Sequence, residues 1–268
     1  MENAHTLDIV MAPVQKGGVI GLTSGPWDGF ACPYLHTPHA DIPALIAVGS
    51  VIADPEGTAQ FRVLSRCLAP QKGSAHARPL LFLEALADEP GSRTLSCTVR
   101  RNGIALAWVT LSDKGFAGLR ADLSGPLIED MVRARMALCR AQGFILPDED
   151  MGIRALLTDL ACTQGYELIL TTGGTGVSPR DVTPQATLAV IEQRLSGIEQ
   201  AMMAASLAQS PHAAISRSVA GTLGRSLIVN LPGSRKAVAE NLESILPALP
   251  HLLEKLSGSP ADCGELSG

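Results

Sequence analysis

The sequence predicts an α/β fold, in which a three-layer domain with a mainly parallel sheet and helices on both faces follows a small β-rich module. From residue 104 onward, short apolar stretches alternate with segments of helical periodicity, a pattern typical of parallel sheets covered by helices. Before that point, frequent Gly and Pro residues separate short apolar runs. This part of the chain therefore favours a compact β structure.

A turn-rich segment around residues 88–103 divides the chain. We expect a β-rich module over residues 1–95, an α/β domain over residues 103–257, and a flexible tail over residues 258–268. Within the module, short apolar runs at 19–22, 45–52 and 59–64 favour β structure, and only residues 79–87 are expected to be helical.

Apolar runs and helical periodicity predict the elements of the second domain. Between residues 124 and 139, Ile128, Met131, Val132 and Met136 fall mainly on one helical face. The expected strands are 104–110, 143–146, 167–172 and 226–230, and the expected helices are 124–139, 149–163, 184–195, 198–209 and 235–246.

Composition limits the classes of function. The chain has 268 residues, of which 46% are hydrophobic and 18% charged, so it is globular and well packed rather than disordered. A net charge of −5 argues against nucleic-acid binding, because there is no general basic field. Local groups must then hold any anionic substrate: backbone amides, a metal, or single residues such as Arg180, Arg217 and Lys236.

Cysteine spacing and hydropathy indicate a soluble, cytoplasmic protein. The six cysteines form no C-x-x-C pair, which favours reduced thiols. The polar N-terminus indicates no secretory signal, and the longest apolar run, residues 42–53, is too short to span a membrane. Cys32, His36 and His39 could suggest a metal site, but no fourth ligand is evident and ordinary loop residues are the favoured interpretation. Trp27 and Trp108 are expected to serve packing.

The most informative stretch is residues 168–187. An apolar strand runs into a loop with Gly173, Gly174 and Gly176, and Asp181 follows just before a helix. Thr183 is expected to be the N-cap of this helix, with a proline at its first position. Glycine backbones allow a ligand close approach, and their exposed N–H groups favour anions. The run is neither the dinucleotide fingerprint nor the P-loop, since no lysine follows the glycines.

Further polar motifs follow other predicted strands, and ligands of parallel sheets lie at the carboxyl ends of the strands. We therefore expect the motifs to converge on one edge of the sheet. They are Ser112 with Asp113, Asp148, the loop from Gly173 through Gly174 and Thr175 to Gly176, and the turn from Asn230 through Pro232 to Gly233.

Residues 168–187 closely resemble the signature of the Mog-type molybdopterin-binding domain, which occurs in bacterial molybdopterin adenylyltransferases and in the G domains of gephyrin and its plant counterpart. The signature, T-x-G-G-T-G followed by R-D-x-T-P-x-A-T, matches residues 171–176 and 180–187. Flanking matches, among them P-D-E at residues 147–149 and S-R-S at residues 216–218, extend the resemblance over residues 103–257. Lys114, where many members carry Arg or Thr, is a departure that keeps a polar or cationic group.

The resemblance implies that the domain adenylylates molybdopterin with Mg-ATP and releases pyrophosphate. It implies Asp148 and Asp181 as catalytic residues and Mg²⁺ ligands. Gly173, Gly174 and Thr175 would bind phosphate. The resemblance also implies a homotrimer, and docking to other proteins of cofactor biosynthesis is possible. Ser112, Asp113, Ser218, Asn230 and Gly233 would shape the pterin side.

Other interpretations stay open. Asp148 and Asp181 could be helix N-terminal carboxylates, and the motifs at Ser112 and Asn230 could be simple turns. The domain could bind or scaffold molybdopterin without turnover, because a fold does not fix function. Molybdate insertion, the reaction of related Moe-type proteins, is the third alternative, and the R-D-x-T-P string favours the Mog branch over it.

Overall fold

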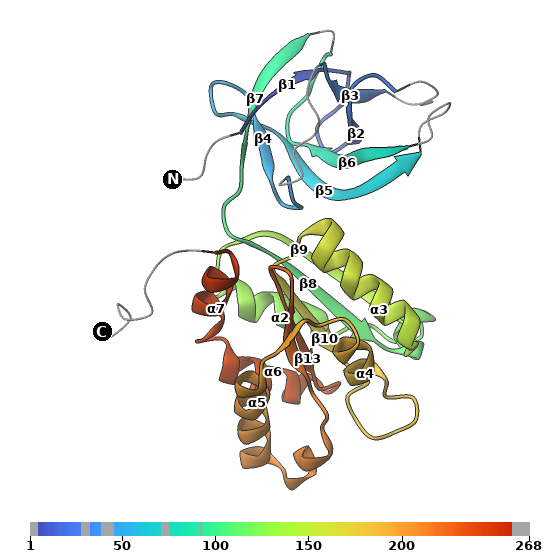
Figure 1. Cartoon of the computed structure of the whole chain (residues 1–268), viewed down its shortest axis with the longest axis vertical. Helices are drawn as coiled ribbons and strands as arrows, with labels where there is room; N and C mark the ends of the chain where they lie inside the picture. The colour runs from blue at the N-terminus through green and yellow to red at the C-terminus, as the bar shows by residue number, and fades with distance from the viewer. Residues whose placement is uncertain (1–4, 28–32, 39–45, 71–75, 92, 259–268) are drawn as a thin grey trace, which may run out of the picture. The chain divides into compact units, whose positions relative to one another are not determined.

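The computed structural model divides the chain into two compact units, Met1–Gly103 and Ile104–Gly268 (Figure 1). The structure describes residues 5–27, 33–38, 46–70, 76–91 and 93–258. The expected tail at 258–268, apart from its first residue, lies outside these ranges, as do Cys32 and His39. Within them, no helix is long and apolar enough to cross a bilayer.

The first unit is a closed β-barrel with the strand order β1-β3-β2-β6-β5-β4-β7. It closes because β1 pairs with both β3 and β7. Inward-facing apolar side chains such as Leu22, Phe61 and Leu83 fill its interior. The strands are β1 His5–Val10, β2 Val19–Ser24, β3 Tyr34–Thr37, β4 Val51–Ala53, β5 Ala59–Pro70, β6 Ala77–Ala85 and β7 Thr94–Arg100, so β7 extends past the predicted limit at residue 95.

The helix predicted at residues 79–87 is wrong, because β6 occupies most of this segment. From Leu81 to Ala85, buried residues alternate with more exposed ones, which is the period of a strand. β6 pairs with β2 on one side and β5 on the other. The Leu- and Ala-rich composition suggested a helix, but these two neighbours determine the structure.

The second unit contains a six-stranded sheet in the order β11-β12-β13-β10-β8-β9. β9, β8, β10 and β13 are parallel, whereas β12 and β11 continue the sheet antiparallel, so the predicted mainly parallel sheet is a mixed one. The strands are β8 Ile104–Leu111, β9 Leu138–Leu146, β10 Leu168–Thr172, β11 Gln193–Arg194, β12 Ala220–Leu223 and β13 Ser226–Leu231.

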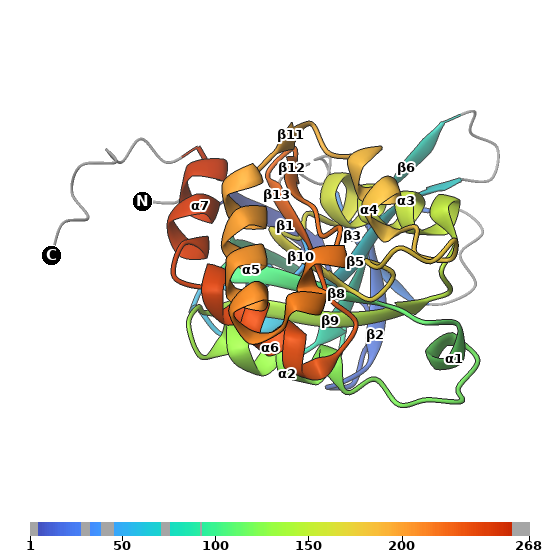
Figure 2. The same ribbon diagram turned by 90° about the horizontal axis from the view of Figure 1, so that it is seen from below.

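Helices cover both faces of this sheet, as predicted (Figure 2). α2, α5, α6 and α7 pack together on one face over a core that includes Leu106, Leu170 and Val229. α3 and α4 contact each other and lie on the other face (Figure 2). The helices are α1 Asp113–Phe116, α2 Ser124–Arg133, α3 Asp150–Thr158, α4 Thr183–Leu188, α5 Ser196–Gln209, α6 Arg235–Ile245 and α7 Leu249–Leu256.

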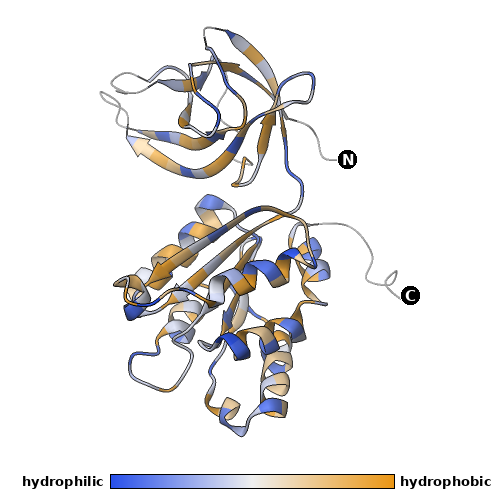
Figure 3. Cartoon of the chain, turned by 180° about the vertical axis from the view of Figure 1, so that it is seen from behind, coloured by the Kyte–Doolittle hydropathy of each residue, from blue (hydrophilic) through white to orange (hydrophobic). Residues whose placement is uncertain are grey.

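Several predicted boundaries are wrong in this unit. The helix predicted at 124–139 ends at Arg133, and the chain then forms β9 along the whole of β8. The helix predicted at 184–195 ends at Leu188, because residues 193–194 pair with β12. A π-helical turn, Asp159–Gln164, extends α3, and α7 was not predicted. Hydropathy alone could not show these limits, since helices and strands both carry mixed colours in Figure 3.

Trp108 is packed between two glycines, as expected for a packing residue. A Cβ at Gly125 of α2 would lie 2.0 Å from the indole nitrogen, and a Cβ at Gly143 of β9 would lie 2.5 Å from the ring. The rigid ring has glycine backbone on both sides, so it has no room to shift. The two glycines therefore let α2 and β9 approach β8 closely.

We predict that Gly143→Ala destabilises the second unit by about 1–3 kcal/mol, because the added methyl overpacks the indole. Gly152→Ala is the matched control: its Cβ would meet only a leucine methyl at 3.8 Å, and alanine favours the helix there. Urea unfolding followed by Trp108 fluorescence in a Trp27→Phe background measures both variants. Equal stability of the two variants would contradict the packing role of the glycine.

A site at the carboxyl ends of the parallel strands

The loops after β8, β9, β10 and β13 meet at one edge of the sheet. The Ser112 N–H donates to the carbonyl of Leu146 at 2.9 Å, which joins the ends of β8 and β9. The Thr172 hydroxyl donates to the carbonyl of Pro232 at 2.7 Å, which joins the ends of β10 and β13. The convergence predicted from the sequence is therefore present in the fold.

The glycine loop after β10 has room only for glycine. Gly173 and Gly174 have φ angles of 101° and 62°, which side chains rarely adopt. A Cβ at Gly173 would lie 2.5 Å from the Leu111 carbonyl oxygen, and one at Gly174 would lie 2.3 Å from Thr183 Oγ1. At Gly176 a Cβ would lie 2.8 Å from a carboxylate oxygen of Asp181. The loop backbone is thus pressed against the strand ends and against the acidic residue behind it.

Thr183 is not the N-cap predicted from the sequence. The N-cap of α4 is Val182, and no side chain caps this helix. The Thr183 hydroxyl is fully buried and donates to the Gly173 carbonyl at 3.0 Å. Thr183 therefore ties the start of α4 to the glycine loop.

Asp148 lies beside this loop with one oxygen unpaired. Its Oδ1 is buried and has no hydrogen-bond partner among the described residues, and it lies 3.0 Å from the position of a Cβ on Gly174. Burial raises the pKa of Asp148 above its ordinary value; the nearby Asp113 and Asp181 carboxylates raise it further, and Arg180 opposes them. An unpaired carboxylate in such surroundings is suited to a cation.

Asp181 is held by the backbone around it. Its Oδ2 accepts the Ser178 N–H at 2.8 Å, and its own N–H donates to the Ser178 carbonyl at 2.9 Å. Neither Asp181 nor Asp148 caps a helix, since the N-cap residues are Val182 and Glu149. Both aspartates lie one residue before a helix N-cap, so their interpretation as helix N-terminal carboxylates stays an alternative.

An ion pair crosses the mouth of the site. Arg180, from the loop after β10, pairs with Asp113, from the loop after β8. The two side chains are 63% and 51% exposed, so a ligand could exchange with either partner. Asp113 also accepts the Asp148 N–H at 3.3 Å, which joins the ion pair to the segment that carries Asp148.

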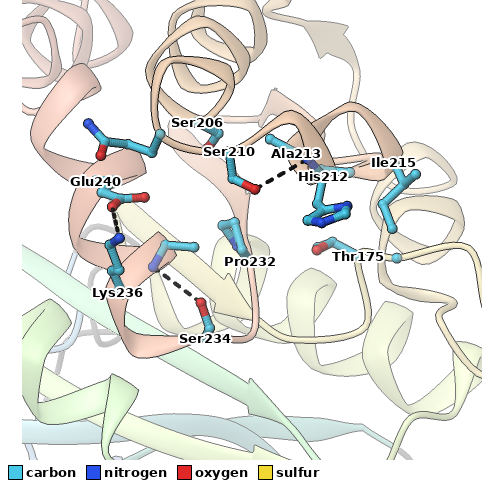
Figure 4. Close-up of a pocket in the computed structure, with 14 residues that line it drawn as sticks. Thr175, Ser206, Ser210, His212, Ala213, Ile215, Pro232, Ser234, Lys236 and Glu240 are labelled. Atoms are coloured by element: carbon cyan, nitrogen blue, oxygen red, sulfur yellow. Dashed lines mark hydrogen bonds and ion pairs between the residues drawn. The ribbon is translucent and has the colours of Figure 1, made fainter.

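Two hollows flank the glycine loop. The first, which we call the serine hollow, has a volume of about 360 Å³ and lies between the loop, the end of α5 and the start of α6 (Figure 4). Its ion pair, Lys236 with Glu240 at 3.6 Å, lies on the side away from His212. Its polar lining comprises Thr175, Ser206, Gln209, Ser210, His212, Ser216, Ser234, Lys236 and Glu240.

The second hollow, which we call the arginine hollow, has a volume of about 220 Å³ and includes Ser112, Gly173 and Gly233. Arg120 and Arg235 also line it, and neither has an ion-pair partner among the described residues. These two arginines were not singled out from the sequence, because each is an isolated charge in a loop or at a helix start. Only the fold places them together.

Asp122 is another lining residue that was not singled out from the sequence as part of the site. Its Oδ1 accepts the N–H groups of Ser124 and Gly125, both at 3.0 Å, and its Oδ2 accepts the Thr110 hydroxyl at 2.9 Å. The signal in the sequence is an acidic residue two positions before a helical serine. This carboxylate fixes the start of α2 against β8.

The five residues expected to shape the pterin side do not lie on one surface. Ser112 and Gly233 line the arginine hollow, whereas Ser218 lines a third hollow beyond the glycine loop. Asn230 is fully buried, and its amide donates to the hydroxyls of Thr171 and Thr187 at 2.9 and 2.8 Å. Asp113 is in the ion pair with Arg180. The structure separates these residues, and their role on the pterin side stays a prediction.

The three cations named for holding an anionic substrate all have protein partners, and Arg180 is the one paired with Asp113. Arg217 donates to carbonyl oxygens of the loop that carries Asp181, and Lys236 pairs with Glu240. Ser112 accepts the Gly115 N–H at 3.1 Å as the N-cap of α1. These contacts therefore hold these side chains in place within the site.

Magnesium fits what remains. Among the described residues, no three His, Cys, Asp or Glu side chains gather as a metal cluster. Mg²⁺ does not need one, because it binds through one or two carboxylates together with substrate phosphates and retained waters. The Oδ1 of Asp148, which has no partner among the described residues and lies close to the glycine loop, suits that mode of binding. His36, the one described member of the predicted Cys/His group, has a pKa lowered by burial.

Comparison with known proteins follows the same strands and loops. Residues 107–251 match the family described as "Probable molybdopterin binding domain". The chain belongs to this family. The match lies within the second unit and confirms the resemblance seen in the sequence.

Individual relatives agree. Gephyrin of Dictyostelium discoideum is 39% identical over 161 residues, which are 57% of this chain and 22% of that protein. A molybdopterin adenylyltransferase of Haemophilus influenzae is 36% identical over 168 residues, 58% of this chain and 85% of that protein. The crystal structure of the molybdopterin biosynthesis enzyme MoaB from Thermus thermophilus superimposes with a TM-score of 0.53 and 41% identity, covering 59% of this chain and 99% of that one. The chain thus spans most of the bacterial protein but about a fifth of the gephyrin.

We predict that Gly174→Ala costs more stability than Gly224→Ala. Both glycines have left-handed φ angles, 62° and 57°, but only the first has a neighbour in the path of a Cβ. The backbone cost of about 1 kcal/mol is common to both, and the clash with Thr183 adds about 1–3 kcal/mol. Urea unfolding measures the difference, and equal losses would show that the loop can yield to a side chain.

The raised pKa of Asp148 predicts that ionisation of this carboxyl lowers the free energy of unfolding. Because the native state holds this proton more tightly than the unfolded state, stability falls as pH rises from 3.8 through the native pKa. Asp148→Asn removes that cost. Without divalent cations its melting temperature should exceed that of the wild type at pH 7, with the gap closing near pH 3.8.

The control for this prediction is Asp130→Asn, which removes an exposed carboxylate from α2. A gap that is the same for both variants, or one that widens on acidification, would contradict the prediction. Addition of Mg²⁺ should raise the melting temperature of the wild type and leave that of Asp148→Asn unchanged.

Proposed function

We propose that the second unit adenylylates molybdopterin with ATP. A phosphate oxygen of molybdopterin attacks the α-phosphorus of ATP, the new P–O bond forms, and the bond to the β-phosphate breaks. The products are adenylyl-molybdopterin and pyrophosphate. The nucleophile is already an anion, so the reaction needs charge neutralisation and alignment rather than a strong general base.

The observation that most supports this proposal is the glycine loop, which lies beside the carboxylates of Asp148 and Asp181. Gly173, Gly174 and Thr175 would bind phosphate here, and the Asp148 Oδ1 close to Gly174 has no hydrogen-bond partner among the described residues. Asp148 and Asp181 would hold Mg²⁺, which supplies charge neutralisation to phosphate oxygens when bound. A glycine loop alone would bind anions, but the carboxylates beside it would repel them unless a cation is present.

The two hollows give each substrate a place on either side of the loop. The serine hollow offers hydroxyls and the Glu240 carboxylate around a mostly apolar space, which suits a flat ring with donor and acceptor edges. The arginine hollow offers Arg120 and Arg235, which have no ion-pair partner among the described residues, and this suits a triphosphate. We therefore place the pterin in the serine hollow and the nucleotide in the arginine hollow, with their phosphates meeting at Gly173–Gly176.

Asp181→Asn tests the proposal in a single-turnover assay with the full chain, molybdopterin and Mg-ATP. Asparagine keeps the size of the side chain and can still accept the Ser178 N–H, but it lacks the charge. We expect formation of adenylylated pterin and pyrophosphate to fall by roughly 10²-fold or more, as for loss of a group that stabilises transition-state charge. Molybdopterin binding, measured by fluorescence, should change by less than about twofold, because that side chain would act only on the reacting phosphates.

Asp130→Asn again serves as the control, with expected wild-type turnover. Equal loss of binding and transfer in Asp181→Asn would argue against the metal role. If the wild-type protein binds molybdopterin and forms no product, the enzyme proposal is wrong and a binding or scaffolding role replaces it.

A further inference from the structure

Arg217 connects the two ends of the loop that carries Asp181. Its Nε donates to the Gly176 carbonyl at 2.6 Å, and its Nη2 donates to the Asp181 carbonyl. Its backbone N–H donates to the Thr175 carbonyl at 3.0 Å. One residue therefore binds three carbonyls, on both sides of a loop that runs from residue 175 to residue 181.

The guanidinium is suited to this task. Its donors are fixed in one plane, so two carbonyls bound to the same fork keep a set separation, whereas a lysine ammonium offers one flexible point charge. The carbonyls of Gly176 and Asp181 both accept from Arg217, so the guanidinium fixes the distance between these two residues, one near the start of the loop and one at its end.

The Asp181 carboxylate depends on that separation. Its Oδ2 accepts the Ser178 N–H at 2.8 Å and lies 2.8 Å from the position that a Cβ on Gly176 would occupy. The carboxylate is thus held inside its own loop and against the glycine at the start of the loop. If the loop ends moved apart, this carboxylate would move with them.

Arg217 itself is anchored to the sheet. Two residues further along, the Val219 carbonyl accepts the N–H of Asn230 in β13 at 2.8 Å, and β12 begins with the next residue. On either side of Arg217, the Ser216 and Ser218 hydroxyls lie 3.1 Å apart and share a hydrogen bond. The arginine therefore joins a rigid part of the fold to a loop that has no secondary structure of its own.

We propose that Arg217 is a positioning residue, which holds loop 175–181 so that the Asp181 carboxylate stays beside Asp148, and that it does not bind substrate phosphate. This rests on the proposed function only for the role of Asp181. Arg180 differs from Arg217, since it projects from the same loop, is largely exposed and pairs with a carboxylate.

The test compares Arg217→Lys and Arg217→Gln with Arg225→Gln, which changes an exposed arginine in the turn between β12 and β13. Hydrogen exchange on the protein without substrates should show faster exchange of the amides at residues 176–181 in both Arg217 variants and no change in the control. This readout needs no activity. Melting curves select variants that keep the fold, and Arg217→Lys retains the charge if Arg217→Gln does not fold.

Kinetics then separate positioning from anion binding. We expect the Mg²⁺ concentration for half-maximal adenylylation to rise about tenfold in Arg217→Lys. The KM for ATP at saturating Mg²⁺ should change by less than about twofold, since an interaction made only through Asp181 leaves substrate binding in place. In an Asp181→Asn background, Arg217→Lys should add no further loss, because the two residues act as one unit.

Three results would overturn the inference: unchanged exchange at residues 176–181, a loss that falls on the KM for ATP, or an undiminished effect of Arg217→Lys beside Asp181→Asn. The second would identify Arg217 as an anion-binding residue. A wild-type protein that forms no product would refute the proposed function instead, and the exchange experiment would still decide whether Arg217 holds the loop.

Discussion

The close approach of the Gly173–Gly174 backbone to the strand ends is the constraint on which the site depends. Parallel pairing sets β10 between β8 and β13 in a register that places Thr172 beside Thr110 and Leu231. The chain must turn at once, and the turn leaves no volume for a side chain against the Leu111 carbonyl. Once the glycines are in place, the remaining loops and both hollows can border the same short stretch of exposed backbone.

The carboxylates of the site make an unfavourable electrostatic contribution to folding, and the protein's own cations offset only part of it. Burial penalises the charge on Asp148, the Asp113 and Asp181 carboxylates disfavour it further, and Arg180 offsets only part of this, so the pKa of Asp148 is raised. Elsewhere in the second unit, carboxylates such as Glu129 and Asp150 have arginine partners four residues away. A carboxylate oxygen left unpaired in the cleft is therefore a local departure, of the kind that marks functional sites.

The sequence predicts the parts of this architecture that depend on local patterns. The glycine loop, Asp148, Asp181 and the strand ends could be predicted, because each is marked by residue types within a short stretch of sequence. What the sequence missed depends on neighbours distant in the chain: β6 is a strand because β2 and β5 flank it, and α2 stops where β9 can pair with β8. Asn230 was expected to contact the pterin, yet its amide in β13 donates to the hydroxyls of Thr171 and Thr187.

The arginines show how an acidic chain can handle anions without a basic surface. Arg217 donates to the carbonyl oxygens of Gly176 and Asp181, so its side chain is bound to the loop. Arg180 is paired but exposed, and Arg120 and Arg235 have no ion-pair partners among the described residues that line their hollow. The same side chain thus takes three roles, and its partners rather than its sequence context decide which. Since the net charge of −5 gives no long-range attraction, selection of an anion must occur at contact distance, where a cation held by Asp148 and Asp181 would add the charge that the protein itself lacks.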